Sequence, residues 1–60
     1  MTWTAKAKAE LSHGNGQNLK HVLSSYLRAD VLAALGQLVV ESQTPEEREK
    51  WQALIEKADR

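Results

Sequence analysis

His21 and Ser25 are the residue pair in this sequence whose types and spacing could support catalysis. They lie four positions apart, so a helix would place the imidazole beside the hydroxyl, as a base next to a nucleophile. Such a pair also needs a third group that orients the histidine, an oxyanion hole and a pocket that excludes water. The sequence indicates none of these, and a chain of 60 residues rarely encloses such a pocket. We therefore expect no catalytic residues.

The segment HGNGQN, residues 13–18, could form a nest of backbone N–H groups that binds an anion ahead of a helix. It lacks the lysine and the preceding strand of a phosphate-binding loop, so a glycine turn is the simpler interpretation. The chain has two histidines and no cysteine, which is too few ligands for a structural zinc site. We expect neither a metal nor a cofactor.

Residues 2–11, TWTAKAKAEL, fit two structures. Apolar and polar residues alternate, which is typical of a half-buried strand. Alanine, lysine, glutamate and leucine nevertheless favour a helix, in which Trp3, Ala7 and Leu11 would share one face. We favour the helix and keep the strand as the alternative.

Residues 12–17, SHGNGQ, are predicted to form a turn. Gly14 or Gly16 can take the left-handed conformation that ends a helix. Asn18 can then act as the N-cap of a helix that begins at Leu19.

The central segment, residues 18–42, holds most of the large aliphatic side chains and carries two apolar stripes. On a helix, the apolar residues of 19–27 lie on one side and those of 31–39 lie roughly 150° away. In one structure the chain turns near 28–30, with Asp30 as an N-cap, so that both stripes face one core. In the other, the helix is continuous and each stripe packs against a different partner. We favour the turn.

The C-terminal helix is the best-defined element in the sequence. Thr44 is placed as its N-cap, Pro45 takes the first helical position and Glu47 completes a T-x-x-E capping box. An apolar stripe follows at helical spacing, formed by Trp51, Leu54, Ile55 and Ala58. These signals predict a helix over residues 45–58.

The chain is expected to form one small domain, residues 1–60. A chain of this size buries only about 60% of its unfolded surface, and no disulfide is present to stabilise it. The aliphatic segment 31–40 has more apolar surface than one short neighbour can cover. We predict an all-α fold, a small bundle of three or four short helices completed by homodimerisation. The expected dimer interface consists of Val31, Leu32, Leu35, Leu38 and Val39.

The strand alternative implies a different function. If residues 2–10 form a strand, Thr4, Lys6 and Lys8 project from one face. A strand followed by two helices resembles the layout of ribbon-helix-helix DNA-binding dimers, whose paired strands enter the major groove and read bases. This resemblance implies a sequence-specific transcriptional regulator. The chain departs from that family in the six-residue loop 12–17 and in its additional C-terminal helix.

The charge balance favours a protein as the target. The net charge is zero, with four basic and one acidic residue in 1–28 and four basic and seven acidic residues in 29–60. Strong non-specific nucleic-acid binding requires a basic surface. The chain has no run of 18 apolar residues, as a membrane span requires, and it does not begin with a secretory signal. We expect a cytoplasmic protein without a membrane anchor or a small-molecule substrate.

The functional hypothesis is therefore a regulatory binding protein that masks, inhibits or bridges a protein partner, as small phage- or plasmid-type inhibitors do. Trp3 lies near one end of the sequence among small residues, and tryptophan is frequent at interface hot spots. The residues expected to face the partner are Trp3, Lys6, Lys20, Tyr26 and Arg28.

Overall fold

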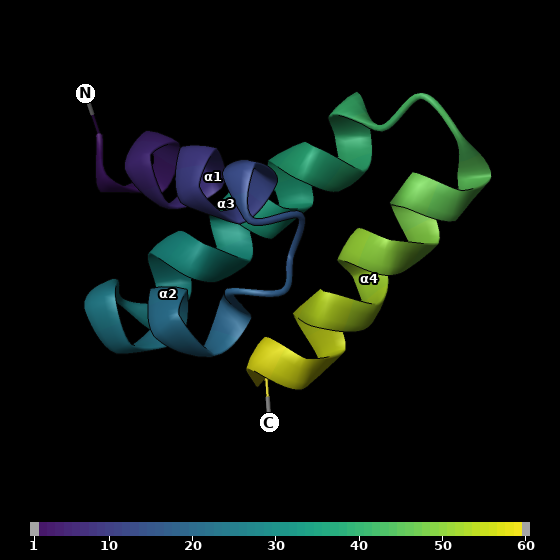
Figure 1. Cartoon of the computed structure of the whole chain (residues 1–60). Coiled ribbons are helices and arrows are strands. Elements are labelled where there is room, and N and C mark those ends of the chain that lie inside the picture. The colour runs from purple at the N-terminus through teal and green to yellow at the C-terminus, as the bar shows by residue number, and fades with distance from the viewer. Residues whose placement is uncertain (1, 60) are drawn as a thin grey trace.

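The computed structural model describes residues 2–59, which form four helices and no strand (Figure 1). The helices are α1 (Trp3–His13), α2 (Leu19–Ser25), α3 (Arg28–Glu41) and α4 (Pro45–Asp59). The predicted all-α fold, a small helical bundle, is confirmed, and the strand alternative for residues 2–11 is wrong. None of these four helices is both long enough and apolar enough to cross a membrane.

Helix α1 forms because its composition and its cap both favour a helix. Thr2 is the N-cap, and its Oγ1 accepts a hydrogen bond from the backbone N–H of Ala5 at 3.1 Å. Ala7 and Leu11, one helical turn apart, are fully buried. A strand would have placed Ala9 on the same face as these two residues, whereas Ala9 is exposed.

Helix α1 ends in a Schellman motif inside the predicted glycine turn 12–17. The backbone N–H groups of Asn15 and Gly16 donate to carbonyls of the last turn of α1, at 3.2 and 3.0 Å. Asn15 is the left-handed residue that ends the helix, with φ at 55°, and Gly16 follows with φ at 82°. Of the two glycines expected as alternatives, Gly16 takes the left-handed conformation and Gly14, with φ at −86°, does not, but the residue that ends the helix is Asn15.

Asn18 occupies the N-cap position of α2, but its side chain makes no capping bond. The side-chain Nδ2 donates instead to the backbone carbonyl of Glu10, at 2.8 Å. The same carbonyl also accepts the backbone N–H of Gly14 at 3.0 Å, so the Asn18 bond is its second. The Asn18 bond ties the end of α1 to the start of α2.

The central segment breaks at Tyr26 and Leu27, before the predicted 28–30. Both residues are extended, with ψ at 159° and 145°, and Leu27 takes the N-cap position of α3. The prediction of Asp30 as an N-cap is wrong, because Asp30 already lies in the first turn of α3. Its carboxylate accepts a hydrogen bond from Thr4 Oγ1 of α1, at 3.2 Å.

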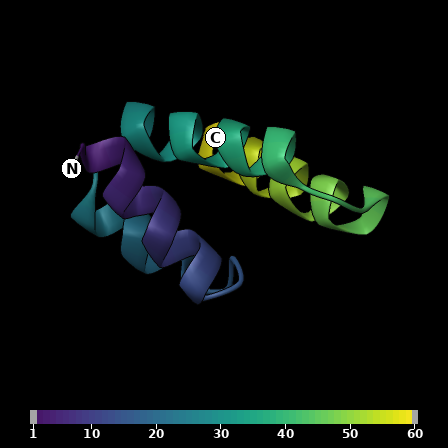
Figure 2. The same cartoon turned by 90° about the horizontal axis from the view of Figure 1, so that it is seen from above.

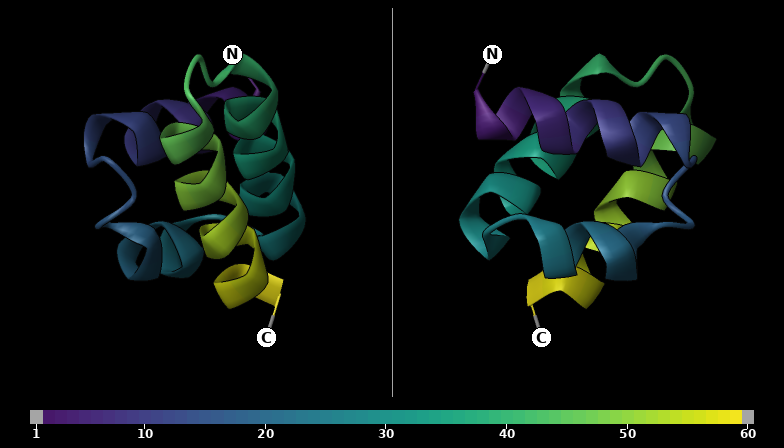
Figure 3. Two further views of the ribbon diagram at one scale, coloured as in Figure 1. Left: turned by 90° about the vertical axis from the view of Figure 1, so that its right-hand side faces the viewer. Right: turned by 60° about the vertical axis from the view of Figure 1, so that its left-hand side comes forward.

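Helix α3 is the centre of the fold and contacts α1, α2 and α4. Figures 2 and 3 show α3 and α4 side by side and antiparallel, with α1 and α2 crossing them on one side. Because α2 folds back, the apolar stripes of both halves of the central segment face one core. The buried core residues are Ala7, Leu11, Leu19, Val22, Val31, Ala34, Leu35, Leu38, Trp51 and Ala58.

The aliphatic segment predicted as a dimer interface lies largely inside a single chain. Val31 and Leu35 are fully buried and Leu38 is 8% exposed, so the prediction is wrong for these three residues. Leu32 and Val39 are partly buried against the same core. Within one chain this segment has three neighbouring helices instead of one, because α1, α2 and α4 all contact α3. The apolar surface therefore gives no reason to require a second chain.

We expect the stability of the chain to be independent of its concentration, because one chain closes its own core. The midpoint of thermal unfolding, followed by circular dichroism, should stay constant over about a hundredfold range of protein concentration. A midpoint that rises with concentration would show that association contributes to stability.

We expect replacement of Gly16 to destabilise the fold. Its φ is 82°, and a Cβ there would lie 2.6 Å from Leu54 Cδ1 and 3.2 Å from Trp51 Cζ3. A left-handed non-glycine residue costs of order 1–3 kcal/mol. Gly16→Ala should therefore lower the free energy of unfolding by about 1–3 kcal/mol, as measured by urea denaturation.

Gly36→Ala is the matched control for this substitution. Gly36 lies inside α3, and a Cβ there would meet nothing within 4 Å. Alanine should raise the free energy of unfolding by about 0.5–1 kcal/mol, because it has the higher helix propensity. Equal effects of the two substitutions would contradict the close packing of the turn on α4.

Candidate functional site

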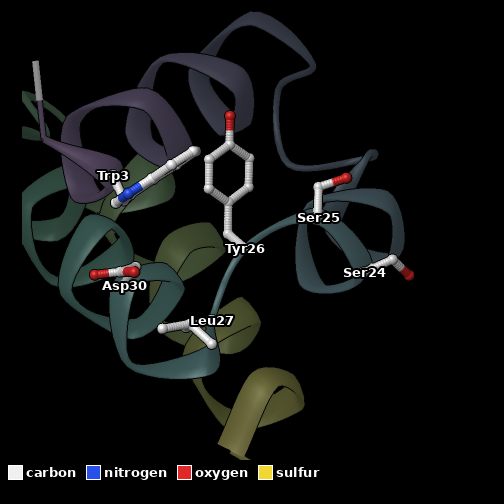
Figure 4. A pocket seen from close by; sticks show the side chains of 6 residues that line it. All are labelled: Trp3, Ser24, Ser25, Tyr26, Leu27 and Asp30. Atoms are coloured by element: carbon white, nitrogen blue, oxygen red, sulfur yellow. The ribbon is translucent and has the colours of Figure 1, made fainter.

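An exposed apolar surface lies where the start of α1 meets the link between α2 and α3. We call it the aromatic surface, and it consists of Trp3, Tyr26 and Leu27 (Figure 4). The rings of Trp3 and Tyr26 meet edge to face, with their centroids 6.0 Å apart and an interplanar angle of 65°. Lys6 Nζ lies 4.6 Å from the centroid of the Trp3 ring. The indole of Trp3 is thus positioned by two contacts within the chain.

A pocket of about 330 Å³ opens on the aromatic surface. Trp3 and Leu27 are 62% and 74% exposed beside it, although both side chains are large and apolar. Figure 4 shows the Tyr26 ring between Trp3 and two serines whose hydroxyls point away from Trp3. The pocket is lined by Trp3, Ser24, Ser25, Tyr26, Leu27 and Asp30. Its walls suit an apolar side chain better than a reacting group.

The phenol of Tyr26 is in an environment that disfavours its ionisation. Partial burial, and then the negative charge of the Glu10 carboxylate, raise the pKa of Tyr26 above its ordinary value of 10.0. Figure 4 shows its hydroxyl pointing towards α1, the helix that carries Glu10. Tyr26 therefore stays neutral at physiological pH and acts at this surface as an aromatic ring and a hydrogen-bonding group.

The structure brings together three of the five residues expected to face a partner. Trp3, Lys6 and Tyr26 are in contact. Arg28 is exposed at the first position of α3 and follows the aromatic surface directly in sequence. Lys20 does not join them, because it lies at the other end of α2 and lines a different depression.

Leu27 belongs to the aromatic surface but was not expected there. On a helical wheel it falls on the same apolar face as Leu19 and Leu23, which indicates a core residue. The break places it outside α2, where its side chain is 74% exposed. No glycine or proline marks this junction, so the sequence carries no local signal for the exposure of Leu27.

The residues of the DNA-binding alternative, Thr4, Lys6 and Lys8, lie on helix α1, and Thr4 and Lys8 contact helix α3. Thr4 donates to Asp30, and Lys8 forms a salt bridge with Glu41. Lys6 lies over the aromatic surface. The ribbon-helix-helix layout is therefore wrong for this chain, because residues 3–13 form a helix and not a strand. These three residues consequently do not lie on a strand that could read bases.

The other chemical candidates of the sequence are not assembled into a site. His21 and Ser25 are both exposed, and no hydrogen bond between them occurs within residues 2–59. The backbone N–H groups of residues 14–17 all donate to backbone carbonyls, so they are not available as an anion nest. The part of the chain that the structure describes contains no group of three metal-ligating side chains.

We expect Tyr26 to ionise above pH 10.0. It is the only tyrosine of the chain, so tyrosinate absorbance during alkaline titration reports on it alone. Glu10→Gln should lower the midpoint without returning it to 10.0, because burial is the larger cause of the shift. Glu56→Gln on α4 is the control and should leave the midpoint unchanged.

The raised pKa of Tyr26 determines how the stability of the fold changes with pH. The contribution of the neutral Tyr26 phenol to folding is fully present below the unfolded-state pKa and is lost as the pH rises through the folded-state pKa. A midpoint at or below 10.0 in the wild-type protein would contradict the packing of Tyr26 against α1.

The chain matches no protein-family model, no curated protein and no solved structure. The feature that can support a function is the aromatic surface, where two aromatic rings in contact line a pocket together with Leu27, two serines and an aspartate.

Proposed function

We propose that this protein is a non-catalytic regulatory protein that binds a protein partner through the aromatic surface. The observation that supports this proposal is the exposure of Trp3 and Leu27, 62% and 74%, beside a pocket walled by Tyr26. Single exposed apolar residues are ordinary on protein surfaces, whereas adjoining ones that line a pocket are typical of binding sites. Covering them would remove apolar area from water, at about 25 cal/mol per Å².

Trp3 has the properties of an interface anchor. Its edge-to-face contact with Tyr26 contributes about 0.5–1.5 kcal/mol, and the ammonium of Lys6 over its ring adds about 0.5–1 kcal/mol at an exposed site. A side chain that is already restricted loses less entropy when it binds. Tryptophan and tyrosine are also the residues that dominate binding energy at protein interfaces.

The chemistry of the pocket indicates what the partner presents. An apolar side chain of the partner would enter between Trp3, Tyr26 and Leu27. An apolar group bound in this way would no longer be available for the other interactions of the partner. Binding would therefore mask or inhibit the partner. The cytoplasmic location stays a prediction of the sequence.

Replacement of Trp3 tests this proposal. Tagged protein would be used to capture proteins from a lysate of the host cells, with quantification by mass spectrometry. Trp3→Ala and Leu27→Ala should each reduce recovery of the captured protein at least about tenfold, the effect of losing a hot-spot residue. Because both side chains are mostly exposed, the variants should keep their helical circular dichroism.

Val40→Ala is the control, since Val40 is 83% exposed and lies outside the pocket. It should capture the same protein in the same amount as the wild type. Unchanged capture by the Trp3 and Leu27 variants would exclude the aromatic surface as the binding site.

A further inference from the structure

A second depression lies between the turn that follows α1, the start of α2 and one flank of α4. Its volume is about 590 Å³, and we call it the lysine pocket. Lys20, Lys50 and Lys57 line it, and no acidic residue does. In a chain with equal numbers of acidic and basic residues, three lysines without a carboxylate form a local excess of positive charge.

The helices explain why the lysines converge. Lys50 and Lys57 are seven positions apart on α4 and therefore share one face. Lys20 is the second residue of α2 and comes from the opposite side of the pocket. Gly16 allows the turn to approach α4 closely, since a Cβ there would lie 2.6 Å from Leu54 Cδ1. This contact keeps the start of α2 beside α4.

The floor of the lysine pocket is apolar. Leu19 and Leu54 line it together with the lysines; Leu19 is 8% exposed and Leu54 is partly buried. A site with an apolar floor and a cationic rim fits a ligand that combines an apolar group with negative charges.

The three ammonium groups differ in their present contacts. Lys50 Nζ bonds to Asn15 Oδ1 and lies 4.4 Å from the centroid of the Trp51 ring, so it is held at the rim. Lys20 and Lys57 are exposed, and neither forms a salt bridge within residues 2–59. These two charges are available to an anionic partner.

We propose that the lysine pocket binds a short acidic segment of a protein, with aspartate or glutamate side chains on either side of an apolar one. The apolar side chain would rest on Leu19 and Leu54, and the carboxylates would pair with Lys20 and Lys57. A long polyanion such as DNA fits less well, because Glu46 lies one helical turn before Lys50 on the same face of α4, and Glu49 and Glu56 lie on the adjoining face. This site is separate from the aromatic surface, and the inference does not depend on the function proposed there.

Nuclear magnetic resonance of the ¹⁵N-labelled full chain tests the inference. The probe is a nine-residue peptide of alternating glutamate and leucine, compared with a peptide in which lysine replaces each glutamate. The glutamate peptide should shift amide signals in residues 16–20 and 50–57, and the lysine peptide should not. Shifts centred elsewhere, equal shifts with both peptides, or none at millimolar peptide would overturn the inference.

Charge-reversal variants locate the site. Lys57→Glu should weaken binding of the glutamate peptide at least about tenfold, since it places like charges together. Arg48→Glu makes the same change in net charge at an exposed position of α4 outside the pocket, and it should bind the peptide as the wild type does. If both variants bound the glutamate peptide equally weakly, the loss of affinity would come from the net charge of the protein and not from the pocket, and the inference would be overturned.

Two further measurements distinguish an acidic peptide from nucleic acid as the ligand, and the lysine pocket from the aromatic surface as the site. A twelve-residue oligothymidylate should bind more weakly than the glutamate peptide, and stronger binding at residues 16–20 and 50–57 would assign the pocket to nucleic acid instead. Trp3→Ala should leave peptide binding unchanged, so failure of the aromatic-surface proposal is distinguishable from failure of this one.

Discussion

The fold depends on covering helix α3, which contacts each of the other three helices. A continuous helix over residues 19–41 would leave apolar stripes on opposite sides, because the pattern shifts by roughly 150° between its two halves. The extended residues Tyr26 and Leu27 remove this conflict, since they let α2 fold back beside α3. Helices α1 and α4 then cover the remaining apolar faces of α3.

Elements defined by local signals were predictable from the sequence. Helix α4 spans Pro45–Asp59 against the predicted 45–58, and Thr44 Oγ1 caps it by accepting a backbone N–H at 3.2 Å. The position of the central break was not predictable. Capping propensity depends on neighbouring residues only, whereas the position of this break is set by the need to turn the apolar stripes of 19–27 and 31–39 towards one core. Asp30 illustrates this difference: its carboxylate binds Thr4, 26 positions away in the chain.

The candidate site was predictable only through residue type. Trp3 and Tyr26 are amphipathic aromatics, which interfaces favour, and the fold places their rings in contact. Leu27 joins them only because the break ends α2 before it. Val31, Leu35 and Leu38, expected at a dimer interface, lie in the core of one chain for a related reason. Periodicity shows which face of a helix is apolar, but it does not show how many neighbours cover that face.

Helix α2 connects the two surfaces physically. With seven residues it is too short to be stable alone, so its position depends on contacts at both of its ends. At its start, Asn18 bonds to the Glu10 carbonyl at 2.8 Å and Gly16 packs on α4. At its end, Tyr26 packs against Trp3. The short helix is therefore held in place by its neighbours α1 and α4 rather than by its own hydrogen bonds.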